Sequence, residues 1–390
     1  MSIGMASTLY QDFSYQKAYI DREDKGMEYL NFFMFIIPTF FALLIHNYLR
    51  HGEMSSKRKW IFGIVYFFLL NAMTLGIAWM RGVKGITFEG MTLTYKLKYT
   101  ILGMVLGFIM PFPICLLTED QITLGGIKRY ALRFIRDIQK YLGYAIRSAK
   151  ADLRAEVANS YLDWLWWMIE PVCTMLIYTL IFGVVFKASE QYFPIFIFIG
   201  ITMWNFFSRS ISGSVNTVRM NKGVITKIYM PKYILLFSKM LVNGFKMLVS
   251  FGVVGIMMLC FKVIPSIYIL YLFPILIILF LLTLGIGMIM MHYGVYVSDL
   301  SYITGIVLNM LMYITGTFYA VAKRIPQPFG ELLEQYNPLA FLIAAMRNAL
   351  LYGQAPSWEL LLFWGFVSMV LIALGAFTIY SNENAYVKVI

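Results

Sequence analysis

Charged residues are scarce in this sequence. They make up 13% of its 390 residues, whereas 60% are apolar and 17% are aromatic. An average soluble domain has about 25% charged and about 45–50% apolar residues. This balance excludes an ordinary soluble protein and indicates an integral membrane protein.

Cysteine and histidine are also rare, with three of each. Cys115, Cys173 and Cys260 fall in three different apolar segments, so we expect neither a disulfide framework nor a metal site. No D-x-D or H-x-x-x-x-D pattern is present to support a membrane-embedded glycosyl- or acyltransferase. No phosphate-binding loop of the form G-x-x-x-x-G-K-S/T occurs either, so ATP would have to be bound by a separate subunit.

Long apolar runs dominate the chain instead. A helix needs about 20 residues to cross about 30 Å of hydrocarbon, and it satisfies its own backbone hydrogen bonds inside lipid. We predict nine transmembrane helices, at residues 29–48, 60–80, 100–118, 161–186, 192–215, 234–261, 267–293, 302–321 and 359–380.

The net charge of +12 is concentrated in loops, and short cytoplasmic loops collect Lys and Arg. Loops 49–59, 119–159 and 219–233 are basic, so we place them in the cytoplasm. Residues 1–28 are polar, carry five acidic residues against three basic ones, and contain no apparent cleavable signal peptide, so we expect the N-terminus outside and the C-terminus inside. The basic loop 81–99 would then be external, which argues against this orientation for the first three spans.

The sequence divides into three parts: a three-span membrane region at 1–118, a polar region at 119–159, and a six-span region at 160–390. In the polar region, apolar residues recur at helical spacing among basic ones, which is typical of a helix on the cytoplasmic membrane surface. These residues are Tyr130, Phe134, Ile138, Tyr141, Leu142 and Ile146. A soluble linker helix packed on a partner is the alternative.

A distinctive motif opens the fourth span, in the stretch SYLDWLWWMIEP. The pattern S-x-L-x-x-L-W-x-x-x-x-P is formed by Ser160, Leu162, Leu165, Trp166 and Pro171. It resembles the first membrane helix of type-2 ABC exporter permeases, in particular those that export polysaccharides such as O-antigen, capsule and teichoic acid.

Two later segments carry the same resemblance. The stretch NKGVITKIYMP is similar to the family's N-x-x-L-I-x-K-x-x-x-P connection, and the matching positions are Asn221, Val224, Ile225, Lys227 and Pro231. The stretch NPLAFLIAAMRNALLYG is similar to the family's Asn-Pro pair followed by an arginine, and the matching positions are Asn337, Pro338 and Arg347, with Gly353 beyond.

The chain also departs from the family pattern. Asp163 stands where relatives usually have glycine, and Ser298 replaces an arginine often found before Asp299. The segment TGTF at 315–318 lacks the usual proline of the fifth core helix. The first 118 residues are outside the common core, and no motif assigns them a role.

The resemblance implies an all-α integral membrane protein of the bacterial cytoplasmic (inner) membrane, with a six-helix permease core preceded by about three additional transmembrane helices. It implies a homodimer that works with two nucleotide-binding ATPase subunits, which would bind ATP and Mg. Part of the 219–233 connection would be a coupling helix that docks on the ATPase through Asn221, Lys222, Ile225, Lys227 and Pro231. Residues 322–358 would form external re-entrant helices, with an external gate at Asn337, Pro338 and Arg347.

A glycan crossing the membrane needs polar and aromatic walls, because each unpaired hydroxyl would cost about 2–7 kcal/mol in hydrocarbon. We expect the substrate channel to involve Trp166, Glu170, Tyr178, Trp204, Phe207 and Arg209. An acidic side chain within a span normally faces a partner or a wet cavity, and Arg209 is the candidate partner of Glu170. Trp164 and Trp167 are expected in the interfacial aromatic belt instead.

The predicted function is therefore that of the permease subunit of an ATP-driven exporter of a lipid-linked polysaccharide. An ABC exporter of a lipid or drug-like substrate is one alternative, and a membrane-embedded glycan-modifying enzyme is another. A secondary transporter or channel is disfavoured, because few buried charges accompany Glu170 and Arg209 and no inverted repeat is evident.

Overall fold

The computed structural model describes residues 36–47, 55–80, 103–104, 107, 110–111, 124–158, 161–185, 190–227, 230–326 and 329–389. Among these residues, every regular element is helical, which confirms the predicted all-α class. The chain divides into two compact units, Met1–Thr123 and Leu124–Ile390.

The first unit contains the helix Ile36–Asn47 and helix α2 (Ser56–Met80). Their small core is formed by Ala42, Tyr66 and Leu70, against which Phe62 and Met110 pack. The buried His46 Nδ1 and Tyr66 hydroxyl lie 2.5 Å apart and join the two helices. The predicted spans 29–48 and 100–118 fall partly outside the described residues, and α2 includes the predicted span 60–80.

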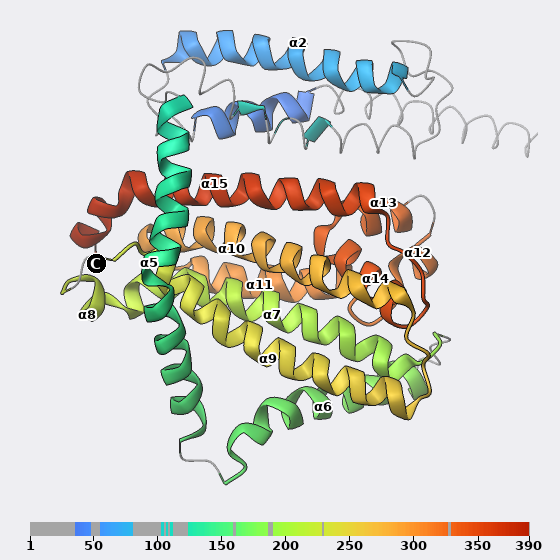
Figure 1. Ribbon diagram of the computed structural model, residues 1–390. Helices are drawn as coiled ribbons and strands as arrows, with labels where there is room; N and C mark the ends of the chain where they lie inside the picture. The colour runs from blue at the N-terminus through green and yellow to red at the C-terminus, as the bar shows by residue number, and fades with distance from the viewer. Residues whose placement is uncertain are drawn as a thin grey trace, which may run out of the picture. The chain divides into compact units, whose positions relative to one another are not determined.

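The second unit contains five helices long and apolar enough to cross a membrane (Figure 1). They are Trp166–Val185, α7 (Phe193–Met220), α9 (Tyr233–Cys260), Ile267–Tyr296 and the first part of α15 (Trp358–Val389). The helix Ile267–Tyr296 consists of the 3₁₀ turn η3 (Ile267–Tyr271) followed by α10 (Leu272–Tyr296). Five predicted spans of the C-terminal region are therefore confirmed.

The eighth predicted span, 302–321, is wrong in length. Helix α11 covers only Leu300–Ile314, which is about 22 Å at 1.5 Å per residue, short of the about 30 Å of a bilayer core. The chain turns at Gly316, whose φ of 72° is in the left-handed region that favours glycine. A Cβ at this position would also collide with the Val321 side chain, so the turn is specific to glycine.

Three short helices follow this turn: α12 (Val321–Arg324), α13 (Phe329–Tyr336) and α14 (Pro338–Leu350). Figure 1 shows them at one end of the helix bundle, while α8 (Lys222–Ile225) and the end of α15 lie at the other.

Helix α7 is the centre of the bundle and packs closely against α9 and α10, while α10 packs along α15. The backbones of α7 and α10 approach very closely at Gly294, where any side chain would overlap the Val215 carbonyl. Gly285 allows a similar approach of α10 to Leu371 on α15. We infer that α7, α9, α10 and α15 form one tightly packed block.

The first spanning helix of this unit is different in character. It begins with a 3₁₀ turn, η1 (Asp163–Leu165), continues as α6 (Trp166–Tyr178), and ends in a π-helical segment, η2 (Thr179–Val185). Pro171 lies inside α6, and most of the side chains of this helix are exposed or only partly buried. It is therefore an outlying helix that contacts the block mainly through α7 and α9.

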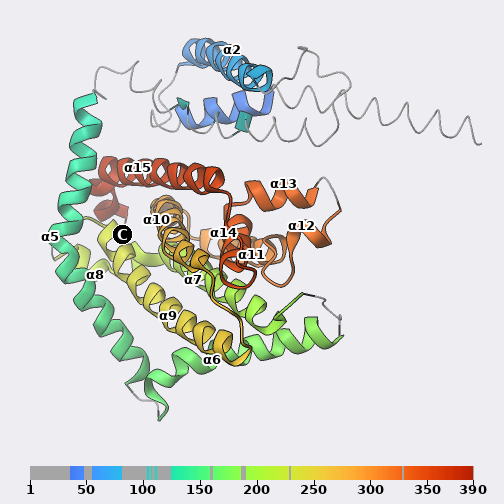
Figure 2. The same ribbon diagram turned by 45° about the vertical axis from the view of Figure 1, so that its right-hand side comes forward.

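Helix α5 (Leu124–Val157) is strongly amphipathic and runs crosswise to α15 in both views (Figures 1 and 2). The Ser238 hydroxyl donates to the Ala145 carbonyl at 3.1 Å, and the Lys246 ammonium lies 2.5 Å from the Glu156 carboxylate. The helix thus packs on α9 of its own chain, while Leu142 and Ile146 of its apolar stripe are 40% and 41% exposed. Its predicted location at the membrane surface stays a prediction.

Candidate functional site

Helix α7 connects three sets of polar contacts in the second unit. Its first turns meet α14 and the turn after α11, its middle pairs with α6, and its last turn leads into the basic connection around α8. With 28 residues, the helix is about 42 Å long. The three regions named by the sequence motifs are therefore joined by one helix.

The first set is built around Arg347 on α14, which is only 4% exposed. Its guanidinium donates three hydrogen bonds to backbone carbonyls, at 3.0 Å to Phe196, 2.9 Å to Gly316 and 2.7 Å to Thr317. It also lies 3.5 Å from the centroid of the Phe196 ring. A buried cation is tolerated only when its donors are satisfied, and here the fixed fork of the guanidinium meets three fixed acceptors. We call this arrangement the Arg347 clamp.

The Arg347 clamp depends on a close approach at Gly200, one turn after Phe196 on α7. A Cβ at Gly200 would overlap the Arg347 guanidinium and would come within 2.6 Å of the Thr317 carbonyl. Only glycine leaves enough room for the arginine to reach the carbonyls of Gly316 and Thr317.

Asn337 supports the same turn from the start of α14. Its side-chain oxygen accepts hydrogen bonds from the backbone N–H groups of Leu339 at 3.1 Å and Ala340 at 3.4 Å, so it caps the helix. Its amide also donates to the Thr315 hydroxyl at 3.3 Å. Pro338 occupies the first helical position, where its fixed φ is favourable. The structure thus brings Asn337 and Arg347 together on the segment 315–317.

A cavity of about 130 Å³ with charged residues in its lining lies beside the Arg347 clamp. The Lys323 ammonium donates to the Glu190 carboxylate at 2.8 Å, and this hydrogen bond raises the pKa of Lys323 above its ordinary value. The Ala322 N–H donates to the Glu334 carboxylate at 3.2 Å. These contacts hold α12 against α13 and against the segment that precedes α7.

The second set is the ion pair between α6 and α7. The Arg209 guanidinium lies 2.5 Å from the Glu170 carboxylate, which confirms the predicted pairing. Both side chains are about half exposed in the single chain. The charges therefore neutralise each other within the membrane-spanning region, at a position that water or a second chain can still reach.

The predicted channel aromatics do not form one wall. Trp204 and Phe207 are 4% and 5% exposed, and they lie in the interior of the chain on α7. Trp166 is about half exposed on the outer face of α6. Tyr178 packs against Phe318, with ring centroids 4.4 Å apart, and so links α6 to the turn after α11. Of these four side chains, only Trp166 and Tyr178 are accessible without a rearrangement.

Trp167, which was predicted to be in an interfacial belt, packs edge-on against Phe245 of α9 at 5.5 Å between ring centroids. Trp164 is 54% exposed. Their location in a belt stays a prediction.

The third set lies at the end of α7. Arg219 donates to the Val295 carbonyl at 3.1 Å, and Ser301 at the start of α11 donates to the Asn216 side chain at 3.0 Å. The amide of Asn221 donates to the Thr217 carbonyl at 2.8 Å and ends the helix. These contacts fix the start of the basic connection to α10 and α11.

The predicted coupling residues surround the short helix α8. Lys222 and Lys227 are exposed, Ile225 is partly buried, and Pro231 is buried where the chain enters α9. Exposed cations next to a partly buried apolar residue suit a docking surface. The docking role of these residues stays a prediction.

Several residues of these sites were missed at the level of sequence. Phe196 and Thr317 accept hydrogen bonds from Arg347 through backbone carbonyls, and Gly200 makes room for it by lacking a side chain; such groups give no motif. Glu190 lies between the fourth and fifth predicted spans. It is one of few acidic residues close to an apolar run, and this feature could have identified it as a candidate partner for a cation, which the structure shows to be Lys323.

Comparison with known proteins matches the same part of the chain. The family described as ABC-2 type transporter matches residues 148–351, just over half of the sequence. The O-antigen export system permease protein RfbA of Myxococcus xanthus is 26% identical over 242 residues, covering 62% of this chain and 93% of that protein. A protein of the same name from Klebsiella pneumoniae is 24% identical over 225 residues, covering 57% of this chain and 86% of that protein.

Proposed function

The chain belongs to the ABC-2 type transporter family, and we propose that it exports a lipid-linked polysaccharide across the bacterial inner membrane as the permease subunit of an ATP-driven complex. Proteins of this family are membrane-spanning permeases without catalytic activity of their own, and they pair with nucleotide-binding ATPase subunits. In this proposal ATP and Mg are bound by that partner and not by this chain.

The observation that carries the polysaccharide assignment is the similarity to O-antigen export permeases over 93% and 86% of their length. The sequence motifs named above lie in the matched part of the chain. The half-exposed Glu170–Arg209 pair, the exposed Trp166 and the partly exposed Tyr178 of α6 add polar and aromatic groups of the kind that sugar rings and hydroxyls contact.

The proposed complex contains two copies of this chain. Both α6 and α11 leave apolar faces uncovered in the single chain, a pattern that marks interaction surfaces or contact with lipid. The exposed residues include Leu176 and Ile177 on α6, Leu180 in η2, and Tyr302, Ile306, Met310 and Tyr313 on α11. In the proposed homodimer these helices face the partner copy and enclose the channel between the two chains.

Trp204 and Phe207 enter this mechanism only when α6 moves. Helix α6 covers part of α7 but is itself mostly exposed, so its displacement would break few contacts. Movement of α6 away from α7 would separate Glu170 from Arg209 and uncover the aromatic side chains on α7. The two buried aromatics would then line the open channel, not the closed one.

The energy of ATP hydrolysis would reach the exit through α7. Closure of the ATPase pair would push on the connection that carries Lys222 and Lys227. The start of this connection is held to α10 by Arg219 and to α11 by Asn216. The other end of α7 carries the Phe196 carbonyl of the Arg347 clamp. A tilt of the helix would therefore act on the segment 315–317 and on α14, which form the proposed external gate.

The proposal is tested by reconstituting the full chain with its ATPase partner in liposomes. Lipid-linked glycan should raise ATP turnover, whereas the same lipid carrier without sugar should not. Equal stimulation by the bare carrier, or by unrelated lipids, would assign the chain to lipid export instead. Failure to bind any ATPase would contradict the permease role as a whole.

A further inference from the structure

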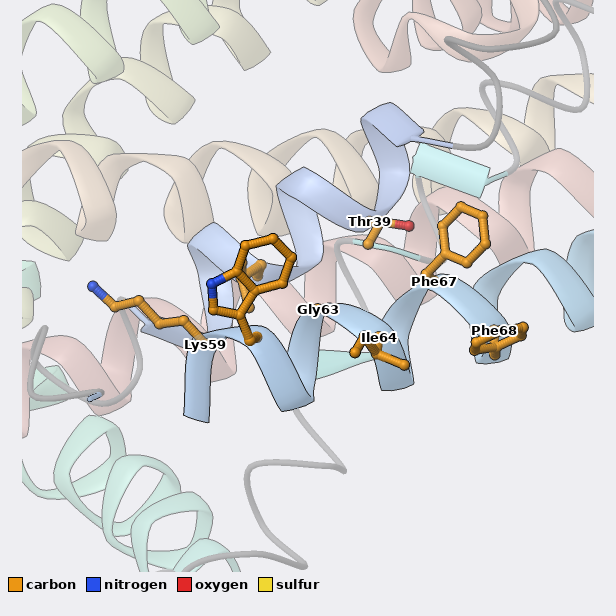
Figure 3. A pocket seen from close by; sticks show the side chains of 8 residues that line it. Thr39, Lys59, Gly63, Ile64, Phe67 and Phe68 are labelled. Atoms are coloured by element: carbon orange, nitrogen blue, oxygen red, sulfur yellow. The ribbon is translucent and has the colours of Figure 1, made fainter. Parts of the chain in front are cut away.

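The first unit, which lies outside the family match, contains an apolar groove between the helix Ile36–Asn47 and α2 (Figure 3). Its volume is about 460 Å³, within the range of about 300–1,000 Å³ typical of ligand sites. The lining residues are Thr39, Leu43, Lys59, Trp60, Gly63, Ile64, Phe67 and Phe68.

The groove is charged at one end only. On the α2 side, the lining residues recur on one face of the helix from Lys59 to Phe68. These two residues are about 14 Å apart along the helix axis, at 1.5 Å per residue. Figure 3 shows the Lys59 ammonium at one end, Gly63 and Ile64 in the middle, and Phe68 at the other end. A ligand that fits this groove has one charged head and a long apolar body.

Charge identifies the head group. Lys57, Arg58 and Lys59 are consecutive, all three are exposed, and the first turn of α2 has no acidic residue. Basic side chains at the end of a membrane helix attract anionic lipid head groups, most strongly at the cytoplasmic leaflet. The basic loop 49–59, which contains these residues, is one of the three loops that the sequence analysis places in the cytoplasm.

The floor of the groove contains Gly63. Glycine destabilises a helix interior relative to alanine, yet a Cβ at Gly63 would meet no atom within 4 Å. Packing within the described part of the chain therefore does not require glycine at this position. The missing side chain instead leaves space inside the groove.

We propose that this groove is a binding site for an anionic membrane phospholipid, with the phosphate at Lys59 and one acyl chain along Gly63, Ile64 and Phe68. A peptide in extended form is a poorer fit, because the apolar walls would leave its backbone groups unpaired. The inference requires only that the chain lies in a membrane, so it does not depend on the transported substrate.

The test uses the full chain purified in detergent and offered equal amounts of dioleoyl phosphatidylglycerol and dioleoyl phosphatidylcholine, with bound lipid measured by native mass spectrometry. The two lipids share their acyl chains, so a preference reports the head group. We expect phosphatidylglycerol to be retained about tenfold more, because both lipids carry the phosphate but the choline ammonium of phosphatidylcholine cancels its charge beside the basic residues 57–59. Equal retention of the two lipids would overturn the proposal.

Two pairs of variants locate the lipid. Lys59→Gln should remove most of the head-group preference, whereas Lys57→Gln, which removes the same charge outside the groove lining, should keep it. Gly63→Leu should lower retention of both lipids by filling the groove, whereas Gly252→Leu, at an open position on α9, should leave it unchanged. Equal effects within either pair would contradict a site in this groove.

Two further arms complete the design. If Gly63→Leu lowers the melting temperature, Ile64→Trp, which adds bulk from an exposed position, replaces it as the blocking variant.

A polyprenyl phosphate is offered in competition with phosphatidylglycerol at equal concentration. If it displaces phosphatidylglycerol, the occupant is the isoprenoid carrier and the phospholipid assignment is wrong.

Discussion

The Arg347 guanidinium lies 3.5 Å from the ring centroid of Phe196 and donates to the carbonyl of the same residue at 3.0 Å. One residue of α7 thus contacts the arginine of α14 through both its side chain and its backbone. The same arginine also holds the carbonyls of Gly316 and Thr317. The fold of this end of the bundle therefore depends on one cation and three carbonyl groups.

Arg347→Lys should lower the free energy of unfolding by about 2–3 kcal/mol, because an ammonium cannot reach three carbonyls and stack on a ring at once. Chemical denaturation in detergent would measure the change. Arg324→Lys is the matched control, since Arg324 is exposed at the end of α12 and should change stability very little. Similar losses in the two variants would contradict the role given to the Arg347 clamp.

Gly200→Ala should damage the same site without touching the arginine. The added methyl group would overlap the guanidinium and approach the Thr317 carbonyl, so we expect a loss of about 1–3 kcal/mol. Gly213→Ala on the same helix meets no neighbour and should be neutral or stabilising by up to about 1 kcal/mol. Thermal unfolding of both variants would distinguish overlap at the clamp from a general effect of helix propensity.

Exchange of the charges of Glu170 and Arg209 tests the ion pair between α6 and α7. Glu170→Arg and Arg209→Glu should each abolish glycan transport, because each places two like charges together in the membrane-spanning region. The double variant should recover a measurable part of the activity. The pair is about half exposed, so its contribution to stability should be below about 1 kcal/mol and transport is the informative readout. Failure of the double variant to recover would count against pairing as the functional requirement.

Lys227→Glu should weaken the stimulation of the ATPase partner at least severalfold while leaving the chain folded. The residue is exposed beside α8, and a reversed charge would oppose docking. Lys262→Glu, in the connection at the opposite end of α9, provides the control for a change in net charge. ATP turnover of the reconstituted complex is the measurement, and an equal loss in both variants would show that the effect is not local.

Hydropathy located most of the membrane helices because length and apolar content are encoded residue by residue. It failed at α11, where the apolar run continues past Ile314 but Gly316 turns the chain. The left-handed φ of Gly316 ends the helix before it is long enough to span the membrane. A single glycine in an apolar run does not predict that backbone angle.

The sequence also located Glu170 and Arg209 as charges within apolar runs, and Asn337 and Arg347 through the family resemblance. The structure gives each of them a partner. The sequence could not give the partners of Arg347, because they are carbonyl groups that every residue carries. It also could not tell which face of α7 is covered by protein. Trp204 is apolar enough for lipid, a channel or a core, and only the packing of neighbouring helices decides among them.

The π-helical segment Thr179–Val185 at the end of α6 holds one residue more per turn than an α-helix would. Its conversion to regular α-helix would rotate the preceding part of α6 by about 100° relative to the following part, the angle of one residue. Tyr178 and Glu170 would turn away from their present partners, while the block of α7, α9, α10 and α15 stayed intact. Such a conversion would give the outlying helix a second register against this block without any change in sequence.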